Sequence, residues 1–449
     1  MSASFRGRRV VVVGAAIAGA AAAEALVAEG ADVLVSEVRP PGEVDALPRL
    51  GERGVEVAAG GHDPTHLDGA TLVVTSPGVA QDAPVLAWAA ERGIPVWSEL
   101  ELGARLVHAP YLAVTGTNGK TTTTGLIASC LRAGGHDAVA CGNIGYPFPR
   151  AAREEHDVLV VEASSFQLRF VETFHPRVSV LLNIAPDHLD WHGSEHAYVQ
   201  TKRTIMRAQG ADDIHVGNRD DARSAAISAD APCPVVWFRR GSPDAGEVGY
   251  VNGTLVSRVE GTESLGSIEG GRAGYREDAA AAAAACVAFG VGPEAVRRGI
   301  ASFTPPNHRG EDVAIVDGVR FVDNSKATNV HAALAAIEAF EGAVLIAGGR
   351  AKGVDLSPLR DRAGRLAGVV GIGESAAEIV ALFDGSVPVR RARSIEEATA
   401  EAFALAPRPG IVLLAPACAS WDMFRDYAER GDRFAAAARA LGEGVAARG

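Results

Sequence analysis

The chain has few cysteines, fewer basic than acidic residues and no long uncharged apolar segment, and each shortage excludes a class of protein. Its five cysteines are scattered and never in C-x-x-C spacing, so neither a disulfide framework nor a thiolate metal site is expected, and a reducing compartment is indicated. The formal net charge of −12 argues against nucleic acid as a general partner, although a local basic pocket for phosphate remains compatible with it. No repeat of fixed period is visible.

One apolar segment, from Val10 to Ala23, has features of a secretion signal, because arginines precede it and A-x-A sequences lie within it. It is too short to span a bilayer. Gly14 and Gly19 stand at turn spacing, and the segment leads into another expected strand, which favours folded structure. We therefore expect a cytoplasmic protein without membrane insertion. We also expect it to be a monomer.

Length and composition predict an α/β enzyme of several domains. A chain of 449 residues is too long for one core and suggests two to four domains. Hydrophobic residues make up 47% and charged residues 22%, with 51 glycines, which is typical of a soluble protein with many turns between strands and helices.

The clearest motif lies in the stretch YLAVTGTNGKTTTT, at 111–124. A short buried strand is expected first, a helix follows, and the turn between them consists of Gly116, Thr117, Asn118, Gly119, Lys120 and Thr121. Glycines admit a phosphate close to the backbone, N–H groups of the helix start point at it, and an ammonium and a hydroxyl complete a site for a nucleoside triphosphate and Mg²⁺. The loop is a compact variant, because the general pattern G-x-x-x-x-G-K-[ST] would need glycine at Val114.

The N-terminal residues predict a βαβ unit whose second strand ends at Glu37. This arrangement is typical of dinucleotide binding, but the turn from Gly14 to Gly19 lacks the middle glycine that lets the backbone reach a pyrophosphate. A nucleotide other than NAD is therefore favoured at these strand ends. A later strand ends in Ser76-Pro77-Gly78, which is either a ligand-binding turn or a plain one.

In the middle of the chain, two expected strands end in polar residues. The first delivers Glu162, whose carboxylate is well placed beside the triphosphate loop to hold Mg²⁺ directly or through water. The second leads to His188, which is equally compatible with a metal ligand and with a hydrogen-bonded loop histidine. A helix is expected over 194–210 with Ser194 as N-cap, and spacing alone predicts that its Lys202 is exposed to solvent.

The last third predicts a further doubly wound domain after a hinge at Pro305-Pro306-Asn307. Three of its expected strands end in the polar loops DNSKATN, GGRAKG and PACASW. Lysine, serine and threonine side chains at one sheet edge describe a pocket for an anionic substrate.

Taken together, the motifs resemble those of the Mur ligases of peptidoglycan synthesis, over nearly the whole chain. They are GTNGKTTTT, GNIG, VEASSFQL, NIAPDHLDWH with a lysine on the next helix, HRGE, DNSKATN, GGRAKG and APACASWDMF. The P-loop is shared with folylpolyglutamate ligases. SKATN and PACAS are more specific, to the branch that adds D-glutamate to UDP-N-acetylmuramoyl-L-alanine.

The resemblance implies three α/β domains and an ATP-dependent amide ligase. A Rossmann-like domain at 1–107 would bind the UDP-sugar, a central P-loop ATPase-type domain at 108–304 would bind ATP, and a Rossmann-like domain at 305–449 would bind the amino acid. ATP would phosphorylate the substrate carboxylate, the amine of D-glutamate would attack the acyl phosphate, and a tetrahedral intermediate would collapse to amide, ADP and phosphate.

Catalytic and ATP-binding roles follow from the same resemblance. The implied catalytic residues are Lys120, Glu162, His188, Lys202 and Asn143. One Mg²⁺ would be held by Thr121 and Glu162, and a second with the help of His188 and of Lys202 as a carbamate, which reverses the expectation from spacing. The implied ATP contacts are Gly116, Thr117, Asn118, Gly119, Lys120, Thr121, Thr122, Arg309, Asn324 and Lys326.

Substrate contacts are implied in all three domains. Glu37 and Arg39 match residues that contact uracil and ribose, and Gly78 lies in the matching turn. The muramoyl contacts would be Asn143 and Ser164. The D-glutamate pocket would consist of Thr328, Lys352, Ser420 and Tyr427, where a lysine and hydroxyls can hold a carboxylate.

Three positions depart from the family pattern. Residues 274–278, GYRED, stand where His-Asn-x-x-Asn is usual, which leaves the adenine contacts open. Asp323-Asn324 reverses the usual Asn-Asp, so a carboxylate has moved by one residue, to the opposite side of the strand if the strand continues that far. Trp421 replaces a smaller apolar residue and could reshape the amino-acid pocket.

Three alternatives to this D-glutamate ligase stay open. They are a Mur-type ligase with another amino acid such as L-glutamate, a catalytically silent nucleotide-binding protein, and an NAD-dependent oxidoreductase. The last leaves the P-loop unexplained.

Overall fold

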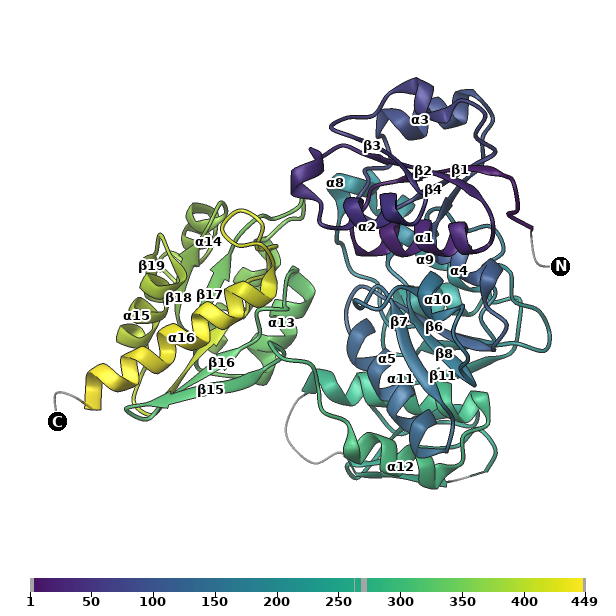
Figure 1. Cartoon of the computed structure of the whole chain (residues 1–449). Helices are drawn as coiled ribbons and strands as arrows, with labels where there is room; N and C mark the ends of the chain where they lie inside the picture. Colours follow the sequence, from purple (N-terminus) through teal and green to yellow (C-terminus); the bar gives the residue numbers. More distant parts are fainter. Residues whose placement is uncertain (1–3, 262, 268–272, 447–449) are drawn as a thin grey trace. The chain divides into compact units, whose positions relative to one another are not determined.

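The structure is a computed structural model that describes residues 4–261, 263–267 and 273–446 (Figure 1). The chain folds into two compact units. The first comprises 1–184, 191–269 and 276–303, and the second comprises 185–190, 270–275 and 304–449. The chain thus leaves the first unit briefly at 185–190, a segment that contains His188.

The first sheet is parallel, with strand order β3-β2-β1-β4-β5. Four consecutive valines make β1, and side chains alternate across a strand, so Val10 and Val12 pack towards α1 while Val11 and Val13 pack towards α3. This confirms the predicted βαβ unit. Its elements are β1 (Arg9–Val13), α1 (Ile17–Ala28), β2 (Asp32–Glu37), α2 (Ala46–Glu52), β3 (Glu56–Ala59), β4 (Leu72–Thr75), α3 (Pro84–Glu91), β5 (Val96–Ser98) and α4 (Glu99–Leu106).

The second sheet has nine strands, in the order β14-β13-β12-β11-β10-β9-β6-β8-β7, and it is parallel except that β13 pairs antiparallel with β12 and with β14. Because β6 lies between β9 and β8, the P-loop and Glu162 leave adjacent strands at the same edge. The strands are β6 (Tyr111–Thr115), β7 (Ala138–Gly142), β8 (Val158–Glu162), β9 (Val178–Leu181), β10 (Ile214–Asn218), β11 (Val235–Phe238), β12 (Glu247–Val251), β13 (Thr254–Ser257) and β14 (Glu263–Ser267). The helices that follow β6 in the chain, before β15, are α5 (Lys120–Ala133), α6 (Phe148–Ala151), α7 (Ser165–Leu168), α8 (Leu189–His192), α9 (Glu195–Arg203), α10 (Ala222–Ser228), α11 (Ala273–Phe289) and α12 (Pro293–Ser302).

The helix predicted over 194–210 is shorter than expected. Ser194 caps α9 as predicted, because its side chain accepts the N–H of Ala197. However, α9 ends at Arg203 and a short 3₁₀ turn follows at Thr204–Met206. The Thr204 hydroxyl contributes to this change, since it donates to the carbonyls of Thr201 and Leu168.

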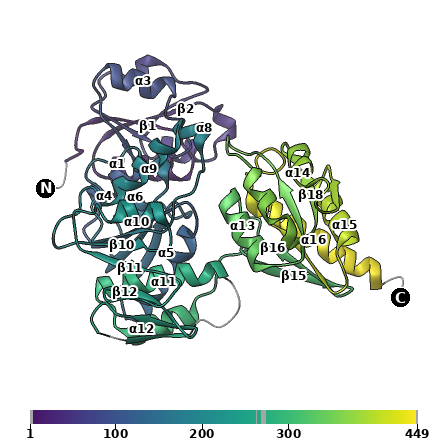
Figure 2. The same ribbon diagram turned by 180° about the vertical axis from the view of Figure 1, so that it is seen from behind.

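The third sheet has the order β15-β16-β20-β17-β18-β19, and all pairs but β15–β16 are parallel. Helices cover both faces: residues of α15 and α16 pack with one set of alternate strand residues, and residues of α13 and α14 pack with the other (Figures 1 and 2). Its elements are β15 (Glu311–Val316), β16 (Val319–Asp323), α13 (Val330–Ala339), β17 (Ala343–Gly348), β18 (Leu366–Ile372), α14 (Ala376–Phe383), β19 (Val389–Arg391), α15 (Ile395–Leu405), β20 (Gly410–Leu414) and α16 (Tyr427–Ala446). Among the described residues, no helix has both the length and the apolar character needed to cross a bilayer.

Candidate active site

The P-loop has the strand, turn and helix that its sequence predicts. Helix α5 begins at Lys120, and its N-cap is Gly119 at φ +83°, a conformation that favours glycine. A Cβ on Gly119 would come within 2.2 Å of Asp278 Oδ1, and one on Gly116 within 2.8 Å of Leu182 Cβ. Close packing therefore requires glycine at position 116, whereas at position 119 the positive φ favours glycine and a side chain would displace the Asp278 carboxylate. Asp278 belongs to the segment that departs from the family pattern, and it lies directly against the loop.

The loop is fixed to the end of the neighbouring strand β9. The N–H of Thr117 donates to the Asn183 carbonyl at 2.9 Å, and the N–H of Asn118 donates to Asn183 Oδ1 at 2.9 Å. Lys120 Nζ lies over the loop, donating at 2.9 Å to the carbonyls of Gly116 and Thr117. The ammonium is thus held beside the backbone that would surround a phosphate. Thr121 is half-buried and Thr122 is buried in the first turn of α5.

Glu162 ends β8 with one carboxylate oxygen bound and the other unsatisfied. Oε1 accepts from Asn143 Nδ2 at 2.9 Å, so the GNIG loop and this strand end are joined. Oε2 is buried and has no hydrogen-bond partner among the described residues. A buried carboxylate oxygen without a partner is costly, and it suits a hard cation such as Mg²⁺. The donor set of this strand end therefore fits the predicted metal.

Lys202 is buried, with 1% of its surface exposed, so the expectation from spacing that it is solvated is wrong. Its Nζ donates to the Gly116 carbonyl at 2.8 Å and lies 4.8 Å from the centre of the Tyr198 ring. The Tyr198 hydroxyl in turn lies 3.0 Å from Thr117 Oγ1. Helix α9 thus brings both side chains to the P-loop, a long-range contact that helical spacing cannot reveal.

Ser164 lies just beyond Glu162 and caps helix α7. Its hydroxyl takes part in a capping box with Gln167, whose side-chain oxygen accepts the Ser164 N–H at 2.8 Å. The Ser164 side chain, predicted to contact the muramoyl group, thus caps a helix in this structure, and it lies two residues after Glu162.

At the first sheet, Glu37 is buried and both of its carboxylate oxygens are bound. Oε1 accepts from the Arg39 side chain at 2.9 Å, and Oε2 accepts the Ala15 N–H at 2.7 Å. The hydrogen bond from Arg39 lowers the pKa of Glu37 to about 2, against the opposing effect of burial. Gly78, at the end of the turn after β4, faces open space where a Cβ would stand.

A cluster beside Glu37 was not predicted. Ser36 Oγ lies 2.8 Å from His62 Nδ1 and 2.9 Å from His66 Nδ1, and both histidines come from the segment after β3. Burial lowers the pKa of His62, and the neighbouring His66 lowers it further. Only the pairing of β2 with β3 brings these residues together, so no local sequence signal could have found them.

In the third sheet, β16, β20 and β17 are neighbours, and their three polar loops meet at one edge, as predicted. Lys326 Nζ lies 3.8 Å from the centre of the Tyr427 ring. This contact places a residue predicted for the nucleotide beside one predicted for the amino acid. The other predicted residues of these loops are Asn324 and Thr328, which are half-buried, and Ser420, which is buried. Arg309 lies before β15 and is half-buried.

Lys352 is buried and forms an ion pair with Asp187. Asp187 precedes His188, whose Nε2 lies 3.7 Å from Asp187 Oδ2 and whose φ is +53°. The sequence predicted a role for His188 and none for Asp187, because the partner lysine is far away in the chain.

In the reversed Asp323-Asn324 pair, Asp323 is the last residue of its strand, and its carboxylate has a structural role there. Strand β16 stops at Asp323, whose buried carboxylate accepts from His308 Nδ1 at 2.6 Å and from the Ser325 N–H at 2.9 Å. Burial raises the pKa of Asp323, and the bond from His308 opposes this. The moved carboxylate therefore fixes the start of the DNSKATN loop. Trp421, the other departure here, is 59% exposed.

Arg430 is a further residue that the sequence did not reveal. It is 1% exposed, and it donates to Ser325 Oγ, to the Ser325 carbonyl and to the Cys418 carbonyl at 3.0, 2.8 and 3.2 Å. Burial lowers its pKa to about 10. One guanidinium thus joins two of the three polar loops.

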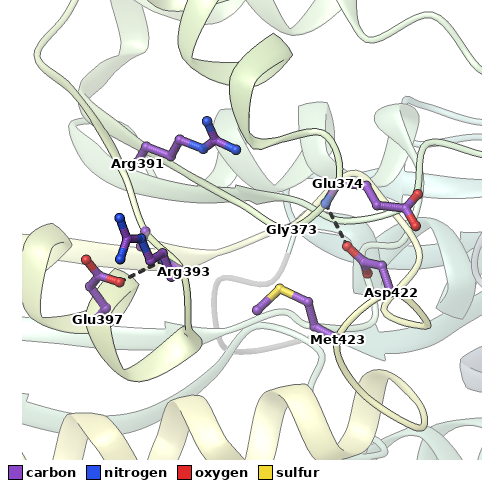
Figure 3. A pocket seen from close by; sticks show the side chains of 8 residues that line it. Gly373, Glu374, Arg391, Arg393, Glu397, Asp422 and Met423 are labelled. Atoms are coloured by element: carbon purple, nitrogen blue, oxygen red, sulfur yellow. Dashed lines mark hydrogen bonds between the residues drawn. The ribbon is translucent and has the colours of Figure 1, made fainter.

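A cavity of about 940 Å³ lies at the ends of β18 and β19 and contains none of the predicted site residues (Figure 3). Glu374 and Asp422 are on one side of it, with the Glu374 N–H donating to Asp422 Oδ2 at 2.8 Å, and Arg391, Arg393 and Glu397 are on the other (Figure 3). Its walls carry charges of both signs, and it belongs to the same sheet edge as the three polar loops without being part of them.

The P-loop, its lysine and the unsatisfied carboxylate at the adjacent strand end define a P-loop nucleotide-binding protein with a site suited to Mg²⁺. Residues 114–264 match the family described as Mur ligase middle domain, and residues 8–98 match the MurD-like N-terminal domain of Mur ligases. The chain is 45% identical to the UDP-N-acetylmuramoylalanine–D-glutamate ligase of Frankia casuarinae, over 98% of this chain and 95% of the relative. It is 43% identical to the protein of that name from Thermobifida fusca, over 97% and 99% of the two chains. The chain belongs to the Mur ligase family.

Solved structures agree at the level of the fold. The pseudomurein peptide ligase type C from Methanothermus fervidus matches with a TM-score of 0.60 and 19% identity, covering 91% of this chain and 96% of the other. The UDP-N-acetylmuramate-alanine ligase from Thermotoga maritima matches with a TM-score of 0.60 and 18% identity, covering 96% and 99%. These likenesses confirm the predicted α/β class with its three sheets.

Proposed function

We propose that this chain is an ATP-dependent ligase that joins D-glutamate to UDP-N-acetylmuramoyl-L-alanine in peptidoglycan precursor synthesis. The observation that carries the proposal is the unsatisfied Glu162 oxygen beside a complete P-loop, in a chain that is 45% identical to a D-glutamate ligase over 98% of its length. A catalytically silent nucleotide-binding protein or an NAD-dependent oxidoreductase would not need a buried carboxylate oxygen without a hydrogen-bond partner beside the P-loop. A ligase that takes L-glutamate is the second candidate, favoured by the bulky Trp421 beside Ser420.

The reaction moves the γ-phosphate of ATP to the substrate carboxylate, with release of ADP. The amine of D-glutamate then attacks the acyl carbon, and the tetrahedral intermediate expels phosphate to leave the amide. Transfer between two anions depends on positioning and charge neutralisation more than on covalent help. In this chain Lys120 and the N–H groups at the start of α5 would provide both to the phosphates.

The donor set at the end of β8 and the start of α5 would hold Mg²⁺ through Thr121 and Glu162, with Asn143 orienting the Glu162 carboxylate. Bound there, the ion would offset negative charge on the phosphates. His188 and Lys202 would help to hold a second ion. For Lys202 we propose carbamylation, which turns a buried ammonium beside the P-loop into an anionic metal ligand.

Binding of the two other substrates would be divided between the sheets. At the first sheet, Glu37, Arg39 and Gly78 would contact the uridine, and Asn143 and Ser164 would contact the muramoyl part. At the third sheet, Thr328, Lys352, Ser420 and Tyr427 would hold D-glutamate, while Arg309, Asn324 and Lys326 would face the nucleotide. We propose the corresponding domain boundaries at 107/108 and 304/305, a monomer and a cytoplasmic location.

The experiment that tests this function measures the incorporation of labelled D-glutamate into a UDP-linked product, with ATP and Mg²⁺ present or omitted. A second arm omits the amino acid and adds hydroxylamine, which traps an acyl phosphate as a hydroxamate. We expect a product that requires both ATP and Mg²⁺, and a hydroxamate only when the UDP-linked substrate is present. A protein that binds ATP and gives neither product would contradict the proposal.

A further inference from the structure

The carboxylate of Asp187 binds two loops of the third sheet at once. Oδ1 accepts from Lys352 Nζ, in the GGRAKG loop, and Oδ2 accepts from Asn329 Nδ2 at 3.2 Å, at the end of the DNSKATN loop. All three side chains are buried. The loops follow β17 and β16, which are separated in the sheet by β20, so no backbone ladder connects them directly.

The Lys352 ammonium keeps donors for a ligand after it has bound Asp187. Its Nζ has one hydrogen-bond partner among the described residues, Asp187, although an ammonium carries three donors. The residue also has φ +58°, a conformation that non-glycine residues rarely adopt. A buried ion pair holds such a side chain in one orientation, which flexible lysines otherwise lack.

Asn329 links the same carboxylate to helix α13. Its Oδ1 accepts the Ala332 N–H at 2.9 Å and so caps the helix, while its amide donates to Asp187. Thr328, predicted for the amino-acid pocket, is the preceding residue. Asp187 therefore sets the relative position of the lysine and the threonine that would hold the D-glutamate carboxylate.

We propose that Asp187 is a positioning residue of the amino-acid site, which holds Lys352 and the Thr328–Asn329 corner in register for the carboxylate of the incoming amino acid. This inference rests on the proposed ligase function. It goes beyond that function because Asp187 would control the binding of D-glutamate without touching it. Asp187 also stands next to His188, so one short segment would serve both the predicted metal site and the amino-acid site.

The test is steady-state kinetics of Asp187→Asn, which keeps the size and an acceptor oxygen but removes the charge. The ion pair that orients the lysine is lost, and the single amide oxygen can no longer accept from both Lys352 and Asn329, so the KM for D-glutamate should rise by about tenfold to hundredfold. The KM values for ATP and for the UDP-linked substrate, and the Mg²⁺ concentration for half-maximal activity, should stay within about twofold. Asp190→Asn is the matched control, because Asp190 is an exposed carboxylate of the same segment.

A double-mutant cycle separates positioning from a general structural role. In a Lys352→Met background, Asp187→Asn should raise the KM for D-glutamate by less than about threefold, because the lysine through which it acts is absent. Asn329→Ser, which preserves a capping side chain, should raise the same KM by a smaller factor than Asp187→Asn. This variant also provides the test if Asp187→Asn does not fold.

Three results would overturn the inference: an unchanged KM for D-glutamate in both Asp187→Asn and Asn329→Ser, an equal rise of all three KM values, or full additivity in the cycle. Failure of the proposed function looks different. In that case the wild-type protein itself shows no phosphate release that depends on an amino acid, and both proposals fall together.

Discussion

Glu162→Gln should separate the stability of this protein from its activity. The wild-type side chain is 2% exposed, and one of its two oxygens is buried with no partner in the described part of the chain. Glutamine has the same length and keeps an oxygen for Asn143 Nδ2. The substitution therefore removes a buried charge with little change in packing.

The expected gain in stability follows from the cost of that oxygen. Leaving a buried polar atom unpaired costs about 1–3 kcal/mol, and more when it is charged. The glutamine amide leaves a neutral N–H in its place, so the net gain without metal and nucleotide should be about 1 kcal/mol. For domains of about 150–250 residues this corresponds to a rise in the unfolding midpoint of about 2–4 °C. Ligase activity should fall at least about 100-fold, because an anionic metal ligand is lost.

The assay is thermal unfolding in the absence of Mg²⁺ and ATP, paired with ligase activity, for the wild type, Glu162→Gln and Glu155→Gln. Glu155 is an exposed carboxylate of the same part of the chain, and its substitution should change neither quantity. A midpoint that falls by several degrees in Glu162→Gln would refute the reasoning, because it would mean that the carboxylate already has a stabilising partner. Unchanged activity would refute the metal role.

Three further predictions concern the P-loop and a buried acid. Lys202→Ala should lose most activity and regain part of it with short carboxylates that replace the proposed carbamate; unchanged activity would exclude the metal role. Gly119→Ala should reduce ATP affinity at least about tenfold and should destabilise the protein by more than Gly135→Ala, for which about 1 kcal/mol is expected. Both glycines have positive φ, but only at Gly119 would a Cβ clash with a neighbour. Isothermal titration and unfolding curves would test this, and an equal loss of unfolding free energy in the two variants would contradict it. Burial raises the pKa of Glu99 to about 7, with a hydrogen bond from Gln167 opposing the rise. The folded state then binds more protons than the unfolded chain between about pH 4.5 and 7, so stability should be lost as pH rises through that window. Glu99→Gln should raise the unfolding midpoint at pH 8 and not at pH 4.5, and a pH-independent effect would contradict the assignment.

Much of the fold could be predicted because its signals are local. The run of valines in β1, the turn glycines and the polar residues after each strand are read directly from neighbouring positions. The P-loop could be predicted from the sequence GTNGK because all residues of this turn are consecutive. Because β8 pairs parallel with β6, Glu162 at the end of β8 lies at the same edge of the sheet as the P-loop, as expected of a carboxylate at a strand end.

The rest of the site depends on contacts between distant segments. Lys202 is buried because helix α9 packs on the P-loop, and Lys352 is bound by a carboxylate 165 positions away. Arg430 likewise binds Ser325, which lies 105 positions before it in the chain. Hydrophobic periodicity identifies a face of a helix or strand but not its partner. Such pairs could therefore be reached only through the resemblance or the three-dimensional structure.

Phosphate release from ATP in the presence of UDP-N-acetylmuramoyl-L-alanine tests the central claim most directly. It should be measured with D-glutamate, with L-glutamate and without an amino acid. The account predicts release that depends strongly on D-glutamate, with one amide formed for each phosphate. Release with L-glutamate alone would show that the pocket beside Trp421 selects the other enantiomer. No release under any of the three conditions, from a protein that binds ATP, would contradict the assignment as a ligase.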